Sequence, residues 1–173
     1  TAMTSNGQAA PAGLSTVRNS NLLQATLPAG SPIFSNPILF NNIFWDNRAG
    51  SRTLQGVSGI GMPGDPNPIN PWDLGVADGT GALNPGYSLL QTPYGEVDTN
   101  IDGLDPLVIS EYDVAISIMP WRGNTNFIGT SLVAVELPPN LMGDYHIQTG
   151  SPARNSGTTV WMTVPAPATD YDD

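Results

Sequence analysis

The sequence predicts an all-β chain built from short extended segments. Nineteen glycines and 17 prolines among 173 residues favour turns and extended backbone over helices. Short runs of Ile, Leu, Phe, Trp and Val are separated by Asn and Gly, which suit tight corners. Only 12% of the residues are charged, which argues against a disordered polyelectrolyte. The length suits one domain with a core of its own.

The first half of the chain divides into an arm, a strand region and a loop region. Residues 1–32 are rich in Ser, Asn, Ala, Gly and Pro and are expected to form an extended arm, with one short strand in the apolar run 22–27. Residues 36–49 carry the strongest strand signal, because apolar and aromatic runs are divided by Asn pairs. The prolines of 59–73 each remove a ladder donor, so we expect an ordered loop excursion over about residues 50–97.

The second half returns to the strand pattern. A corner followed by a strand is expected within residues 98–109, and further strands at 114–119, 131–137 and 144–147. The last residues, 161–173, are expected to form an extended acidic tail. The predicted organisation is therefore an arm (1–32), a strand-rich body (33–160) and a tail.

Residues 144–157, Asp-Tyr-His-Ile-Gln-Thr-Gly-Ser-Pro-Ala-Arg-Asn-Ser-Gly, resemble a signature near the C-terminal end of right-handed parallel β-helix surface proteins. Residues 36–49 and 98–109 show weaker likenesses to coils of that family, and most of the chain is unmatched. The resemblance implies C-terminal coils of a right-handed parallel β-helix over residues 33–160, with Asn side chains that can stack in ladders at the corners.

The same resemblance implies an extracellular or cell-surface location. In the family, a stretch similar to residues 164–170 runs on into another strand, so the chain is expected to be part of a longer protein. A coil cannot bury its inner face alone. We therefore expect the chain to dock on the upstream part of the same precursor or on another protein chain.

The charge balance restricts the partners. Fifteen acidic residues stand against five arginines and no lysine, for a net charge of −10. This argues against nucleic acid and anionic membrane surfaces, which need clustered cations. The absence of cysteine excludes disulfides, thiolate zinc sites and cysteine nucleophiles. No window approaches the ~18 apolar residues of a membrane span, so none is expected.

One segment predicts a calcium site. Oxygen-bearing side chains at positions 1, 3 and 5, with Gly103 at position 6, match the first half of a calcium loop. Position 12 is Ile109 instead of an acidic residue. The alternative interpretation is a turn that leads into a strand. The candidate ligands are Asp98, Asn100, Asp102 and Asp105.

No catalytic residue is predicted. His146 is the only histidine, and although Asp144 and Ser151 lie near it in sequence, the family signature accounts for it as a strand residue. The motifs of polygalacturonase-like β-helix hydrolases are absent, and the lysine that a lyase could use as base is missing. Asp46 and Asp102 are conceivable as a carboxylate pair for glycoside hydrolysis. No cofactor motif is present.

Three functions are consistent with these features. The first is a non-catalytic structural or adhesive module of a larger extracellular β-helix protein. The second is a C-terminal accessory module of a larger secreted enzyme, polysaccharide-active or oxidoreductase, with its active site elsewhere. The third is a carbohydrate-binding module that uses Trp72 and Trp121, since aromatic faces stack on sugars. The alternative for both tryptophans is a role as core or loop anchors.

Overall fold

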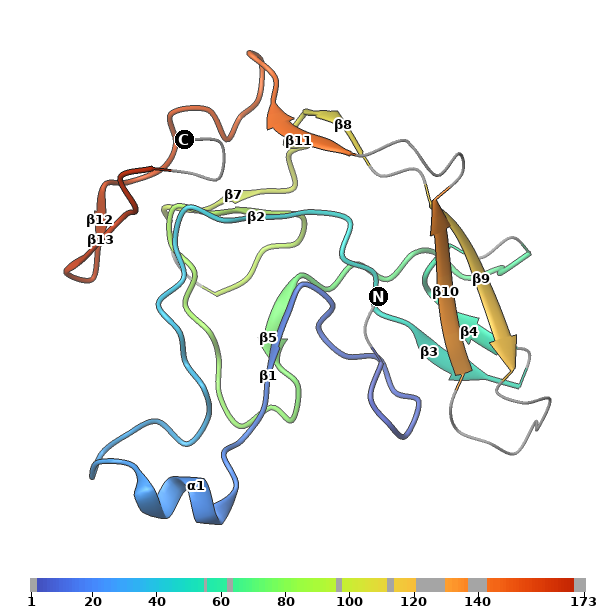
Figure 1. The fold of residues 1–173 in the computed structure, drawn as a ribbon, viewed down its shortest axis with the longest axis horizontal. Coiled ribbons are helices and arrows are strands. Elements are labelled where there is room, and N and C mark those ends of the chain that lie inside the picture. The colour runs from blue at the N-terminus through green and yellow to red at the C-terminus, as the bar shows by residue number, and fades with distance from the viewer. Residues whose placement is uncertain are drawn as a thin grey trace.

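The computed structural model describes residues 3–54, 56–61, 64–95, 98–111, 114–120, 130–136 and 143–169 (Figure 1). Strands and turns make up most of this part, which contains one short helix, so the chain is all-β in class. The elements are β1 (Leu14–Thr16), α1 (Asn21–Thr26), β2 (Ile43–Phe44), β3 (Ser51–Thr53), β4 (Gly56–Ser58), β5 (Leu74–Val76), β6 (Leu89–Leu90), β7 (Ile101–Asp102), β8 (Val108–Ser110), β9 (Val114–Pro120), β10 (Thr130–Glu136), β11 (Asp144–Ile147), β12 (Val160–Trp161) and β13 (Val164–Pro165).

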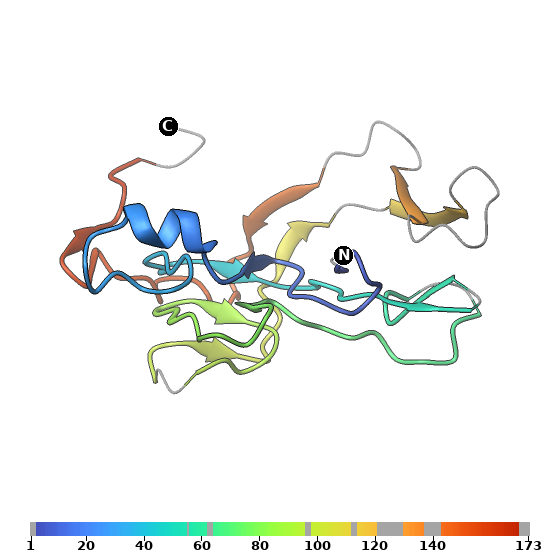
Figure 2. The same cartoon turned by 90° about the horizontal axis from the view of Figure 1, so that it is seen from below.

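Strands β2, β6 and β7 form a parallel ladder with β6 in the middle. Leu89 is in register with Ile43 on one side and with Ile101 on the other. Figure 2 shows the three strands one below another. Each strand has only two residues, yet the three strands pair in the same register although they come from segments far apart in sequence. The register, more than the strand length, therefore defines this part of the fold.

A second parallel pair extends the same stacking. Strand β1 pairs with β5, with Leu14 opposite Leu74. Because β1 and β2 both precede their partners β5 and β6 in the chain, residues 14–44 lie as a first layer on residues 74–90, the second layer. Strand β7 begins a third layer.

The core lies between the strands of these layers. Its fully enclosed members come from the second layer, and half-buried side chains from the first layer pack against them. The buried cluster is Leu74, Val76, Leu83 and Leu90, with Leu14, Phe34, Leu39, Phe44 and Tyr94 around it. The second layer is thus the central one.

Two sequence expectations are corrected in the first half. The predicted loop excursion over 50–97 contains β5 and β6, which are fully buried, because the prolines of 59–73 end before these strands begin. The predicted short strand at 22–27 is instead α1. The Ser20 side chain accepts a hydrogen bond from the Leu23 N–H, a capping contact that favours a helical start, and Pro28 follows the helix and cannot continue it.

Strands are present at 114–120, 130–136 and 144–147, as predicted, but their pairing is antiparallel. Strand β9 pairs with β10, and β8 pairs with β11. The nine residues between β9 and β10 are fewer than the dozen or more that a parallel crossover needs. The expectation that these strands continue a parallel stack is therefore wrong for β8, β9, β10 and β11. The β9–β10 hairpin lies at one extreme end of the molecule, away from the layers (Figure 1).

The start of the predicted tail folds as a hairpin of β12 and β13. The ring of Trp161 packs over Gly86, where an added Cβ would lie 2.7 Å from the ring. Trp161 also meets Tyr87 edge to face, with 5.2 Å between ring centroids. The hairpin thereby packs on the second layer next to β6.

Candidate functional site

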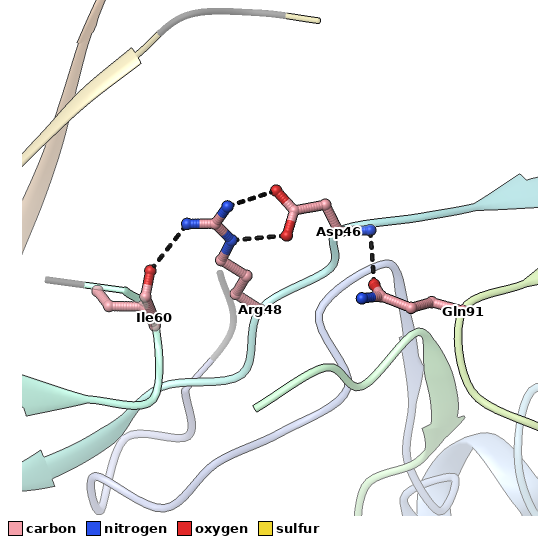
Figure 3. Close-up of polar contacts among 4 residues, drawn as sticks. All are labelled: Asp46, Arg48, Ile60 and Gln91. Atoms are coloured by element: carbon pink, nitrogen blue, oxygen red, sulfur yellow. Dashed lines mark hydrogen bonds and ion pairs between the residues drawn. The ribbon is translucent and has the colours of Figure 1, made fainter. Parts of the chain in front are cut away.

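The most organised polar site lies where β2 and β6 end (Figure 3). The Arg48 guanidinium donates to both carboxylate oxygens of Asp46, at 2.7 and 2.6 Å, and its third nitrogen donates to the Ile60 carbonyl at 3.1 Å. The Asp46 backbone N–H donates to the Gln91 side-chain carbonyl at 2.8 Å. The hydrogen bond with Asp46 raises the pKa of Arg48 above its ordinary value. This bidentate pair connects three segments.

A buried carboxylate, that of Asp73, directly precedes β5. Asp73 is 1% exposed, and one of its oxygens accepts the backbone N–H groups of Gln91 and Thr92 at 2.7 and 3.2 Å. The other accepts the Asn47 side-chain amide at 3.1 Å. Both oxygens are therefore satisfied, as a buried polar group requires. Asp73 connects the first layer, through Asn47, to the chain after β6.

A polar column precedes the three strands of the parallel ladder. Asn42, Ser88 and Asn100 occupy equivalent positions, each one residue before its strand. The Ser88 hydroxyl accepts the Asn42 N–H at 3.2 Å, and the Ser88 N–H donates to the Asn100 side-chain carbonyl at 3.1 Å. The Asn100 amide donates to the Pro85 carbonyl at 2.9 Å. These side chains satisfy backbone groups at the corners.

The predicted calcium ligands are spread around this corner. Asn100 uses its side-chain oxygen and nitrogen on residues 88 and 85. One Asp105 oxygen accepts the Leu107 N–H at 2.8 Å, a turn contact of the kind expected before a strand. Asp98 and Asp102 are exposed. Within the described ranges no three His, Cys, Asp or Glu side chains converge to hold a metal. Calcium binding by these residues stays a prediction.

Of the two candidate sugar-binding tryptophans, only Trp72 lies in the described part of the chain. Trp72 is half-buried, and its backbone accepts from Ala12 N–H and donates to the Asn47 carbonyl. It therefore anchors the first layer to the strand β5 that follows it. Trp121 lies outside the described residues. Carbohydrate binding stays a prediction.

The two carboxylates considered for glycoside hydrolysis are placed on different strands. Asp46 follows β2 and is engaged by Arg48, with the two side chains 40% and 28% exposed. Asp102 is on β7, with β6 between the two strands. His146 contacts Asp144 at 2.6 Å on exposed β11, and this contact lowers the pKa of Asp144. In the described residues, the Asp46 carboxylate is thus held by Arg48, and Asp46 and Asp102 belong to the two outer strands of the ladder.

Sequence reasoning missed the most important polar residues. Asp73, Gln91 and Ser88 were not singled out, although Asp73 and Ser88 are nearly inaccessible to solvent. The only sequence signal for Asp73 is that it directly precedes the apolar residues of β5. A single aspartate between a tryptophan and a leucine cannot be distinguished from a turn residue without its partners.

Comparisons with protein-family models, with curated proteins and with solved structures find no match for this chain. No helix in the described part of the chain is long and apolar enough to cross a membrane. The class that fold and site define is therefore an all-β protein with stacked parallel layers whose polar side chains connect one layer to the next.

Proposed function

We propose that the chain is a non-catalytic structural and adhesive module of a larger extracellular protein, built from turns of the right-handed parallel β-helix type. One observation supports this most. Two stretches of chain, 14–44 and 74–90, stack with β1 on β5 and β2 on β6, and β7 adds to the same ladder. Successive layers in one register are the arrangement of solenoids, whose stability comes from contacts between neighbouring repeats.

The polar side chains favour a structural role for the same reason. The side chains of Asp73 and Asn100 bond to segments distant in sequence, and the Gln91 side chain accepts the backbone N–H of Asp46. A buried carboxylate whose oxygens are held in this way, as in Asp73, connects the layers to one another, and this supports a structural role. In this role the module would dock on other coils of its precursor or on a partner chain.

Amide hydrogen exchange tests the stacked layers directly. The N–H groups of Leu89, Gln91, Ile101 and Gly103 donate to carbonyls of the strand above, with N···O distances from 2.8 to 3.1 Å. They should exchange slowly, as the most protected group in the chain. Exchange as fast as that of the exposed amides of α1 would show that the parallel ladder is not formed and would reject the proposal.

The enzymatic alternative has its own test. The full chain is incubated with a panel of soluble polysaccharides, and reducing ends and unsaturated products are measured. A structural module gives none. Cleavage that disappears in Asp46→Asn, while the protein stays folded by circular dichroism, would overturn the non-catalytic assignment.

A further inference from the structure

The first layer has backbone groups that point away from the second layer. Asn42 and Phe44 both turn their carbonyls to β6, where they accept from Leu89 and Gln91. Successive residues of a parallel strand direct their backbone groups to opposite sides. The N–H and C=O of Ile43 therefore point to the other edge of β2. Ser15 is placed in the same way on β1, because Leu14 and Thr16 both bond to the β5 side. We call these two outward-facing strand edges the first-layer edge.

Aliphatic side chains along this edge are exposed to solvent and are not covered by other parts of the described chain. Ile43 is 42% exposed, whereas Leu89, its register partner in the central layer, is 2% exposed. Val17, beside β1, and Ile38, before β2, are also exposed aliphatic residues of the first layer. The same strand position is thus covered in the second layer and open in the first.

The two ends of the stack differ in charge. All 15 acidic residues of the chain lie at Asp46 or later, and Arg18 is the only charged residue among the first 45. At the opposite end, Asp102 of β7 is in register with Leu90, so a carboxylate occupies the position that Leu90 fills in the core. Native sheets protect open edges with charged residues. The β7 end has this protection and the first-layer edge lacks it.

Resting on the proposed function, we propose that the first-layer edge is a docking site for an extended, uncharged strand of a partner polypeptide that carries aliphatic side chains. The strand adds beside β2 and bonds to the outward N–H and C=O of Ile43. Interface centres are depleted of charged residues, as this edge is. Strand addition to an open sheet edge is an established mode of peptide recognition. A head-to-tail second copy fits less well, because its β7 end would bring Asp102 against apolar side chains.

The test uses the full chain with a tethered probe strand. A copy of residues 84–92, which contains the β6 sequence, is fused ahead of the chain through a flexible Gly-Ser linker, so that the strand is held at a local concentration in the millimolar range. Amide exchange of Ile43 and Ser15 is measured by NMR with and without the fusion. Exchange at Ile43 should slow by about tenfold or more in the fusion, while exchange at Asp102 stays unchanged.

Matched controls separate the possible failures. A fusion whose two probe leucines are changed to aspartate should leave Ile43 exchange fast, and Ile43→Lys should abolish the protection without loss of the β6 amide protection. If Ile43 stays fast in the fusion while Leu89 and Ile101 stay slow, the docking site is rejected and the proposed function is retained. If Leu89 and Ile101 are also fast, the proposed function itself fails. If the unfused chain sediments as a dimer and its Ile43 amide is protected from exchange, the occupant of the edge is a second copy of the chain, and the proposed partner strand is rejected.

Discussion

The Asp73 carboxylate accepts the backbone N–H of Gln91 at 2.7 Å from a position that is 1% exposed. Asp73 directly precedes β5 and Gln91 directly follows β6, so this contact joins both ends of the second layer. The same carboxylate holds the Asn47 side chain of the first layer. The contact therefore helps to set the relative position of two layers between which only a few strand residues are paired.

Replacement of Asp73 with alanine should destabilise the chain more than any exposed acidic substitution. It leaves the Thr92 N–H and the Asn47 amide without the acceptor they have in the parent, and it leaves the Gln91 N–H with only the Phe44 carbonyl, at a cost of about 1–3 kcal/mol for each buried group left unsatisfied. We expect a loss of ~3 kcal/mol or more in the free energy of unfolding, measured by urea denaturation. Asp98→Ala, at an exposed site, is the control. Equal urea midpoints for the two variants would contradict the structural role of Asp73.

Asn100→Ala should loosen the third layer. The side chain bonds the Ser88 N–H and the Pro85 carbonyl, and loss of both contacts should lower the free energy of unfolding by about 1–2 kcal/mol. Hydrogen exchange at Ser88 should accelerate as well. Asn36→Ala, at an exposed position of the first layer, should change neither quantity. Unchanged Ser88 exchange in Asn100→Ala would show that the polar column does not hold the layers.

The β12–β13 hairpin should be stabilised by a standard turn sequence. Its two central residues, Met162 and Thr163, have φ of 45° and 70°, as in type I′ turns, where Asn-Gly is strongly preferred. Positive φ is particularly unfavourable for a β-branched residue. The double substitution Met162→Asn, Thr163→Gly should raise the free energy of unfolding by about 1 kcal/mol. Thermal denaturation measures this, and a lower midpoint than that of the parent would refute it.

Acid should weaken the loop around Asp65 in a defined direction. Backbone N–H groups of Asn67 and Gly59 donate to its carboxylate and lower its pKa below 3.8. A group whose pKa is lowered on folding contributes stability at pH values above its ordinary pKa, and this contribution is lost as the pH falls through the lowered value. The stability difference between the parent and Asp65→Asn should therefore be constant above about pH 5 and shrink below pH 4.

Urea midpoints of both proteins across pH 2–7 measure this difference. NMR titration of the Asp65 carboxyl carbon gives the pKa independently. If the stability difference between the parent and Asp65→Asn grows as the pH falls, the pKa of Asp65 is raised on folding, and the hydrogen-bonded carboxylate is excluded.

The sequence allowed a partial prediction of the fold. Strand formation at 43–44 and 144–147 followed from apolar runs bounded by Asn and Gly. Asn42 and Asn100 lie at equivalent corners, but Ser88 lies between them, so they do not stack directly on one another. Strands β5 and β6 were not predicted, because two or three residues are too few to show a period. The antiparallel pairing of β8 with β11 was also missed, since alternation within a strand does not indicate the direction of its partner.

The candidate site was less predictable than the strands. Asp73 and Gln91 are 18 residues apart, and nothing local distinguishes them from exposed turn residues. Asp46 was noted only as one half of a conceivable catalytic pair, whereas its partner is Arg48, two residues later. A hydrogen-bond role depends on which groups converge in space, and this information is not contained in the neighbouring residues.

The sequence by itself determined that the chain is all-β, acidic, free of cysteine and rich in corners, because composition and local spacing restrict the backbone directly. Only the tertiary structure decided which short strands pair, in which direction, and that the second layer is the central one. These properties depend on contacts between segments tens of residues apart, where burial of Leu89 and Leu90 and satisfaction of Asp73 select one register among many with similar local propensity.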